Sequence, residues 1–199
     1  MRMTVKIILP ALALLGVLAA RPGTALAAGR VVHDRDEVLH QFFAGADRVE
    51  TQTVTVTPEL AARLKNRLGY VPAAASYTVW VGKKNGHEIG YAVVDDEKGM
   101  HEPITFAVLI GTDGSVARQE VLVYREPEGD GVTSHRFTSQ FVGKTMKDPI
   151  RAGEDITIVS SATISSNSMA VGVKRALAIV TEGLLTPQTA AGRLPGSGT

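Results

Sequence analysis

The chain of 199 residues contains no cysteine. This absence excludes disulfide bonds, thiolate metal sites, iron–sulfur clusters and thioether-linked haem together. A redox function would therefore require an added organic cofactor. The histidines are scattered, and none forms the i, i+4 pair of a helical zinc site. We interpret them as surface or loop residues; they are His33, His40, His87, His101 and His135.

An excess of charge of one sign is also lacking. The formal net charge is +1, and three positive charges lie at the N-terminus, on Arg2, Lys6 and Arg21. Without those three, +1 becomes −2 for the rest of the chain. A nearly neutral chain lacks the basic face that nucleic acid requires, so no nucleic-acid partner is expected. The length suits one ordinary domain with a hydrophobic core.

Long hydrophobic runs are few. The run from Ile7 to Ala20 contains Pro10 and is short for spanning about 30 Å of hydrocarbon. Basic residues precede it, and Ala25-Leu26-Ala27 offers the small side chains that signal peptidase accepts. We predict a cleavable signal peptide over residues 1–27, and hence a periplasmic or other extracytoplasmic location. The alternative is a retained membrane anchor.

Two helices are predicted in residues 28–72, which we interpret as a helical preface to the main domain. Asp34 and Asp36 can cap the first helix. The second has Thr57 as its cap, Pro58 at its first position and Gly69 at its end. The apolar positions at helical spacing are Val38, Leu39, Phe42 and Phe43 in the first helix and Leu60, Leu64 and Leu68 in the second.

From residue 73 onward the pattern changes to apolar runs separated by turns. Asn85-Gly86 and Asp113-Gly114 tolerate the positive φ angles of tight hairpins. The pattern therefore predicts an antiparallel sheet with packed helices, which is the α+β fold class. The last run alternates only in part, so it predicts a strand without defining its buried face. The runs are Tyr77 to Val81, Ile89 to Val94, Ile104 to Ile110 and Val116 to Tyr124.

The segment from Arg125 to Gly153 is rich in glycine, proline and charge. A connection of this length is often functional. The alternative is a surface loop without a function, anchored to the domain by Phe137 and Phe141. Beyond the main domain, residues 186–199 carry few large apolar side chains, and we expect this tail to be disordered.

Hydroxyl side chains crowd residues 160–166, just before the last predicted helix. A helix N-terminus exposes unpaired N–H groups and the positive end of the helix dipole, so this turn could seat a phosphate. The alternative is ordinary N-capping, for which serine, threonine and asparagine are favoured in any helix. The helix itself is indicated by one apolar face made of Met169, Ala170, Val173, Ala176, Leu177 and Val180.

The turn from Ser160 to Ser166, Ser-Ser-Ala-Thr-Ile-Ser-Ser, resembles a family signature, Ser-Gly-Ala-Thr-x-Ser/Thr. That family is the FMN-binding domain of the small flavin-carrying subunits of the Rnf and Nqr complexes and of related exported proteins. Three further segments are similar to the family's in the same order. They are His101-Glu102-Pro103-Ile104, Tyr124-Arg125-Glu126 before a glycine-rich stretch, and Phe-Thr-Ser-Gln-Phe-Val-Gly-Lys over residues 137–144.

The resemblance implies one FMN-binding domain over residues 73–185. It implies that Thr163 carries FMN through a phosphoester bond made by a flavin transferase that uses FAD. It further implies an electron carrier, rather than a substrate-transforming enzyme, that works with membrane or periplasmic redox partners. No catalytic residue and no metal site are predicted. The predicted cofactor-binding residues are Thr163, Ser160, Ser161, Ala162, Ser165, Ser166, Glu102 and Glu126.

Two departures from the family pattern leave alternatives open. The family usually has glycine where this chain has Ser161. It usually has aspartate six residues before the threonine, where this chain has Thr157; Asp155 lies two residues earlier. The chain could therefore be a flavin-free binding or assembly module that retains the fold, or a reductase that binds FMN noncovalently.

Overall fold

The structure, a computed structural model, describes residues 29–186. Its centre is one antiparallel sheet with the strand order β1-β6-β5-β4-β3-β2. The strands are β1 (Arg30–Val31), β2 (Arg48–Thr55), β3 (Ser76–Lys84), β4 (His87–Lys98), β5 (Pro103–Ile110) and β6 (Val116–Tyr124). The α-helices are α1 (Arg35–Phe42), α2 (Pro58–Leu68), α3 (His135–Thr138) and α4 (Thr163–Val180). The predicted α+β class with an antiparallel sheet is confirmed.

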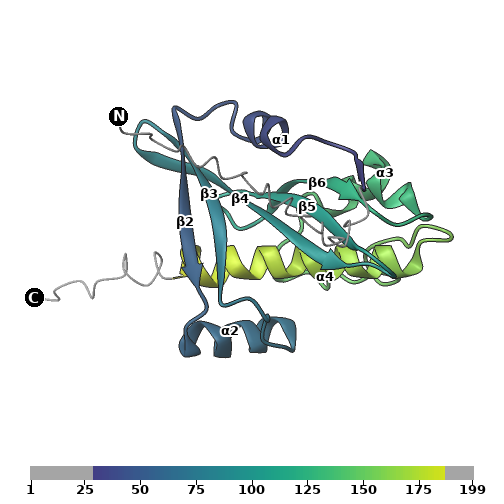
Figure 1. Cartoon of the computed structure of the whole chain (residues 1–199). Coiled ribbons are helices and arrows are strands. Elements are labelled where there is room, and N and C mark those ends of the chain that lie inside the picture. Colours follow the sequence, from purple (N-terminus) through teal and green to yellow (C-terminus); the bar gives the residue numbers. More distant parts are fainter. Residues whose placement is uncertain (1–28, 187–199) are drawn as a thin grey trace, which may run out of the picture.

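Helices cover both faces of the sheet. Figure 1 shows α1 above the sheet and the long helix α4 below it, with α2 beneath the C-terminal part of α4. The main core lies between the sheet and α4, where Phe106 and Leu177 are fully buried. On the α1 side, Val38 packs with Ala107 and Leu122. The sheet is therefore covered on both faces, and its strand ends are left for a site.

The two predicted N-terminal helices are present with the expected caps. The Asp34 side chain accepts hydrogen bonds from the backbone N–H groups of Asp36 and Glu37, so Asp34 is the cap of α1. Thr57 accepts a hydrogen bond from the N–H of Leu60 at 3.3 Å. Gly69 ends α2 with φ of 83°, a left-handed conformation that glycine adopts without steric penalty.

The description of residues 28–72 as a helical preface is incomplete, because this segment also supplies strands to the sheet. β2 lies between the two helices and pairs with β3 along its whole length. β1 pairs with β6 at the opposite edge. Most β2 side chains are exposed or half-buried, so the strand has only a weak apolar pattern in the sequence. The preface and the sheet are thus one structural unit.

The last strand, β6, lacks regular alternation because its pairing with β5 is irregular. The register shifts between Thr105 and Phe106 and again between Leu109 and Ile110. A β-bulge changes which face the following side chains occupy. Gln119 and Glu120 are consecutive in the sequence and both are buried. The predicted strand is confirmed, and the bulges account for its unclear buried face.

The long segment after β6 is folded against the core rather than extended over the surface. It contains two 3₁₀ helices, η1 (Asp130–Thr133) and η2 (Ser139–Phe141), on either side of α3. Phe137 and Phe141 are buried and meet edge to face, with their ring centroids 5.6 Å apart. The predicted anchoring by these two phenylalanines is therefore present.

Helix α4 lies close to the sheet and is fixed along its length. Gly172 lies so near Phe106 that a Cβ atom at this position would come within 2.7 Å of the ring. Further along α4, the Arg175 guanidinium pairs with the carboxylates of Asp95 and Glu97 on β4. The start of α4 is thereby held in a definite position relative to the ends of β4 and β6.

The C-terminal end of α4 continues as a π-helix, η3 (Thr181–Leu185). Its buried Glu182 pairs with Arg67 at 2.7 Å and Arg63 at 3.5 Å, both on α2. These two ion pairs, which share Glu182, join α2 to the end of α4.

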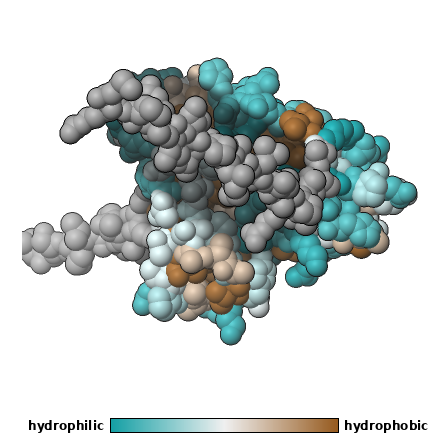
Figure 2. Space-filling view, in the orientation of Figure 1, coloured by the Kyte–Doolittle hydropathy of each residue, from teal (hydrophilic) through white to brown (hydrophobic). Residues whose placement is uncertain are grey.

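Figure 2 shows a face of the molecule whose described part is mainly hydrophilic, with small apolar patches, one of them at the bottom of the view over the region of α2. Within residues 29–186, no helix has the length and hydropathy needed to cross a membrane. The predicted signal peptide lies outside the described residues, as does the predicted tail apart from Thr186.

Candidate functional site

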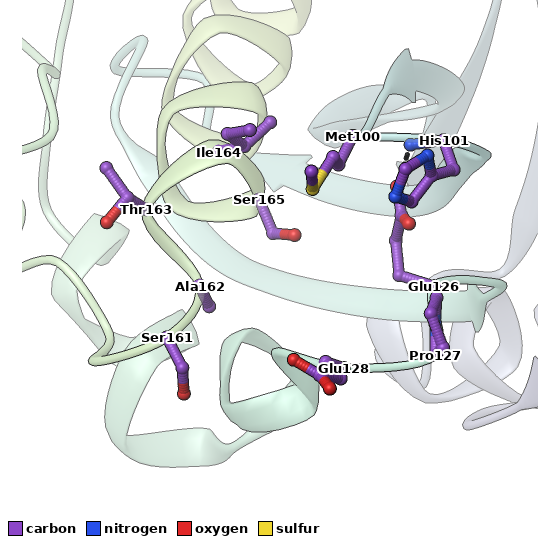
Figure 3. Close-up of a pocket in the computed structure, with 10 residues that line it drawn as sticks. All are labelled: Met100, His101, Glu126, Pro127, Glu128, Ser161, Ala162, Thr163, Ile164 and Ser165. Atoms are coloured by element: carbon purple, nitrogen blue, oxygen red, sulfur yellow. Dashed lines mark hydrogen bonds between the residues drawn. The ribbon is translucent and has the colours of Figure 1, made fainter.

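A cavity of about 500 Å³ lies where three segments meet at one end of the sheet. They are the turn between β4 and β5, the loop after β6, and the N-terminus of α4. Figure 3 shows the first two segments facing the start of α4 across the cavity. The residues that line it are Met100, His101, Glu126, Pro127, Glu128, Ser161, Ala162, Thr163, Ile164 and Ser165.

Glu126 joins two of these segments. Its Oε1 atom accepts hydrogen bonds from the backbone N–H of His101 at 2.7 Å and of Glu102 at 3.1 Å. Gly99 makes this possible, because a Cβ there would lie 2.3 Å from the same oxygen. The Glu126 carboxylate is therefore a structural clamp between the β4–β5 turn and the loop after β6. Glu102 contributes its backbone, and its side chain is not among those that line the cavity.

The N-terminus of α4 has no side-chain cap within the described part of the chain. The N-cap position is Ala162, which has no side-chain acceptor, and the first turn contains no acidic residue. The alternative of ordinary N-capping by the surrounding hydroxyls is therefore wrong for this helix. The first N–H groups of α4 remain available to an anion, together with the positive end of the helix dipole.

Thr163 is the first residue of α4, and its side chain is exposed at the cavity. Its hydroxyl has no hydrogen-bond partner among the described residues, whereas the serine hydroxyls at 165 and 166 are both engaged. An exposed and unpaired hydroxyl beside free N–H groups is open to chemical modification without loss of internal contacts.

The sharp turn before α4 depends on small residues. Ser161 has φ of 61°, in the left-handed region that glycine adopts most easily. Ala162 is buried against Gly129, where an added Cβ would come within 2.9 Å of the Ala162 Cβ. Ala162 is thus small chiefly because the loop after β6 packs against it, as well as because it lines the cavity.

Ser165 positions the helix and does not donate into the cavity. The Tyr124 hydroxyl donates to the carbonyl oxygen of Glu128 at 2.7 Å, and Ser165 Oγ lies 3.1 Å from the same tyrosine oxygen. A tyrosine hydroxyl has one proton, so Ser165 must be the donor in the second bond. Burial is the largest contribution that raises the pKa of Tyr124 above its ordinary value, which keeps this hydroxyl protonated.

The remaining two predicted serines lie outside the cavity. Ser166 is fully buried, and its Oγ accepts a hydrogen bond from the N–H of Val159 at 3.1 Å. It therefore stabilises the turn. Ser160 lines a neighbouring cavity of about 550 Å³ on the other side of the same turn, together with Arg136 and Thr157. The sharp change of direction at Ser161 lies between the two cavities.

The Phe-x-x-Gln-Phe-x-Gly-Lys segment holds the chain that leads into the turn. Gln140 accepts a hydrogen bond from the Thr157 N–H at 2.7 Å and donates to its carbonyl oxygen at 3.4 Å. Lys144 donates to Asp155 at 2.8 Å. Gln140 and Lys144 are therefore positioning residues, and they fix residues 155–157 ahead of Thr163.

Asp155 has a structural role that prevents it from replacing an aspartate at position 157. Its carboxylate also accepts hydrogen bonds from the N–H groups of Ile150 at 3.1 Å and Arg151 at 2.7 Å. Burial raises the pKa of Asp155, but the hydrogen bonds from Lys144 and from these N–H groups lower it by more, and the net shift is downward. Thr157, in contrast, presents an exposed side chain.

The cavity combines an apolar wall with two carboxylates. Met100 and Ile164 are 58% and 46% exposed and supply an apolar surface to the cavity. Figure 3 shows them near one another on the side of the cavity away from Glu128. Glu126 and Glu128 supply negative charge, and no described residue that lines the cavity is lysine or arginine.

The structure thus brings together five of the eight predicted cofactor-binding residues and separates three. Thr163, Ser161, Ala162, Ser165 and Glu126 line the cavity; Ser160, Ser166 and Glu102 do not. The sequence interpretation missed five lining residues, which are Met100, His101, Pro127, Glu128 and Ile164. Each of them lies within or beside a family-like segment, and that position was the available signal.

Comparisons with known proteins find a family model that matches the segment around the cavity. The family model of the FMN-binding domain matches residues 99–178, which confirms the resemblance found in the sequence. Among solved structures, NqrC of Shewanella oneidensis is similar, with 19% sequence identity and a TM-score of 0.47. That match covers 76% of this chain and 88% of NqrC. No curated protein matches the chain.

Proposed function

Because residues 99–178 match the FMN-binding domain family, we propose that this protein is an exported electron carrier whose FMN is linked through its phosphate to Thr163. All three segments around the cavity belong to the matched range. The observation that carries the proposal is the exposed, unpaired Thr163 hydroxyl at the uncapped start of α4.

The described residues suit FMN in size and chemistry. About 500 Å³ is within the usual range for a small-molecule site. The N–H groups at the start of α4 would bind the phosphate, and Met100 with Ile164 would contact the apolar ring system. When bound, FMN can exchange one or two electrons, and the protein supplies its position and electrostatic surroundings.

The linkage requires a flavin transferase that uses FAD. The Thr163 oxygen would attack the flavin-side phosphorus of FAD, and the bond from that phosphorus to the AMP oxygen would break. AMP leaves with the bridging oxygen, and the threonine proton is released with it. The exposed position of Thr163 supports this route, because an enzyme must reach the hydroxyl from outside.

The test is the intact mass of protein expressed with an active transferase. We expect an added mass equal to FMN less one water, retained in Ser160→Ala and lost in Thr163→Ala. Thr163→Ser, which keeps a hydroxyl, should be modified in part. An unmodified, colourless wild-type protein, beside a control acceptor that is modified, would reject the proposal in favour of a flavin-free module.

A second part of the same experiment tests whether the residue at position 157 affects flavin attachment. Its side chain is exposed on the segment before Thr163, where a modifying enzyme can contact it. If the transferase reads an aspartate there, Thr157→Asp should accelerate flavin attachment, and Thr157→Asn should not. A yellow wild-type protein whose colour is lost on denaturation and filtration would instead support a noncovalent FMN-dependent reductase.

A further inference from the structure

His101 is the one histidine that lines the cavity, and it lies in the turn between β4 and β5. Its backbone N–H is fixed by Glu126, so the position of the residue is defined. Its imidazole has no hydrogen-bond or ion-pair partner among the described residues. Figure 3 shows the ring across the cavity from Thr163. An imidazole is the side chain that most often changes charge between pH 5 and 8.

The charged and titratable groups around His101 are mainly acidic. Glu126 and Glu128 line the cavity from the loop after β6, and the buried hydroxyl of Tyr124 lies behind Glu128. Glu102 is the next residue in the turn. The helix opposite contributes Thr163, Ile164 and Ser165, which carry no charge.

Two basic residues adjoin the cavity-lining segments in the sequence, and neither of them lines the cavity. Lys98 ends β4 and is absent from the cavity lining, and the Arg125 guanidinium binds the carbonyl oxygen of Pro103 and the hydroxyl of Thr105. Among the described residues that line this cavity, added negative charge would therefore meet two carboxylates, and the α4 N-terminus and His101 could compensate it.

We propose that His101 takes up a proton when the FMN in this cavity is reduced, and thereby adds to the pH dependence that the proton on the ring already gives to the reduction potential of the flavin. This inference rests on the proposed function. Two electrons come from the external donor, one proton from solvent binds to the flavin ring, and a second proton from solvent binds to His101. The ring gains one net negative charge, which the imidazolium balances.

The direction of the effect follows from linkage. A reduced, negatively charged ring favours protonated His101, and by reciprocity protonated His101 favours the reduced ring. The potential should therefore rise as the pH falls through the range in which His101 gains its proton. Above that range His101 is neutral and contributes little.

The experiment measures the midpoint potential of flavin-loaded protein by titration with dithionite and mediators, between about pH 5 and pH 8. His101→Gln removes the titrating group. His101→Lys supplies a permanent positive charge. The control is His87→Gln, an exposed histidine at the opposite end of the 12-residue strand β4.

We expect wild type and His87→Gln to show the same dependence of midpoint potential on pH. His101→Gln should fall below them at low pH and converge at high pH, and His101→Lys should lie above His101→Gln throughout. If flavin-loaded His101→Gln protein gives the same potentials as wild type at every pH, the proposed role of His101 is rejected and the proposed function is unaffected. Wild-type protein that carries no flavin, covalent or bound, overturns both.

Discussion

At the scale of single residues, Ser161 holds a conformation that its side chain disfavours. Its φ of 61° lies in the left-handed region. That region costs a residue other than glycine about 1–2 kcal/mol, whereas glycine loses about 0.5–1 kcal/mol through extra backbone entropy. This explains in physical terms why the family signature has glycine at this position.

We expect Ser161→Gly to raise the free energy of unfolding by up to about 1 kcal/mol, as the difference between those two terms. Chemical denaturation of the unmodified protein would measure it. Ser160→Gly is the matched control, because Ser160 is not among the described residues with positive φ, and it should be destabilised. A Ser161→Gly protein no more stable than Ser160→Gly would contradict this explanation.

The sequence predicted the lining of the site best where a residue type has one main use at its position. Thr163 and Glu126, which line the cavity, were predicted from the resemblance of their segments to those of the family. Ser166 could not be assigned correctly, because capping, cofactor binding and turn stabilisation all favour serine. His101 was missed because its residue type alone does not indicate which loop histidine faces a cavity; its place beside Glu102 in a family-like segment was the available signal.

At the scale of the secondary-structure elements, the contact between α4 and the sheet depends on one glycine. A Cβ at Gly172 would come within 2.7 Å of the Phe106 ring, which is fully buried and cannot move aside. Alanine is favoured over glycine in a helix by about 1 kcal/mol. Overpacking a core costs about 1–3 kcal/mol, so the loss should dominate.

Gly172→Ala is therefore expected to lower the free energy of unfolding by about 1 kcal/mol. Val171→Ala, at the exposed position next to it, should leave stability unchanged or slightly higher. Thermal and chemical denaturation of the two variants would compare them directly. Equal stability would mean that α4 can move away from β5 at little cost.

Elements with strong local signals were predicted well, and those that depend on partners were not. α2 has its cap, its first-turn proline and its left-handed glycine in the sequence, and each is used as expected. β2 was missed because an edge strand exposes most of its side chains and needs no apolar alternation. The bulges in β6 arise from its pairing with β5, which no single segment records.

At the scale of the whole molecule, Glu182 connects the N-terminal and C-terminal parts of the chain. It is buried, whereas its partners Arg63 and Arg67 are 41% and 51% exposed. The helices α2 and α4 meet near this point. The prediction of a helical preface did not specify such a link, because the partners lie more than a hundred residues apart.

Glu182→Ala should lower the free energy of unfolding by about 1–3 kcal/mol, because hydrogen bonds to a buried charged group are lost while both arginines can turn to solvent. Hydrogen exchange should show the largest increase in α2. Glu154→Ala, which removes an exposed pair with Arg151, should change stability by about 0.5 kcal/mol or less. Similar effects of the two variants would show that Glu182 does not join the helices.

The uncapped start of α4 also bears on the order of events during maturation. Two buried contacts within the chain shape this turn: Ala162 packs against Gly129, and Ser166 accepts a hydrogen bond from the Val159 amide. If FMN is linked to Thr163 as proposed, these contacts would let the polypeptide fold first and receive the flavin afterwards, on an acceptor turn that is already in place.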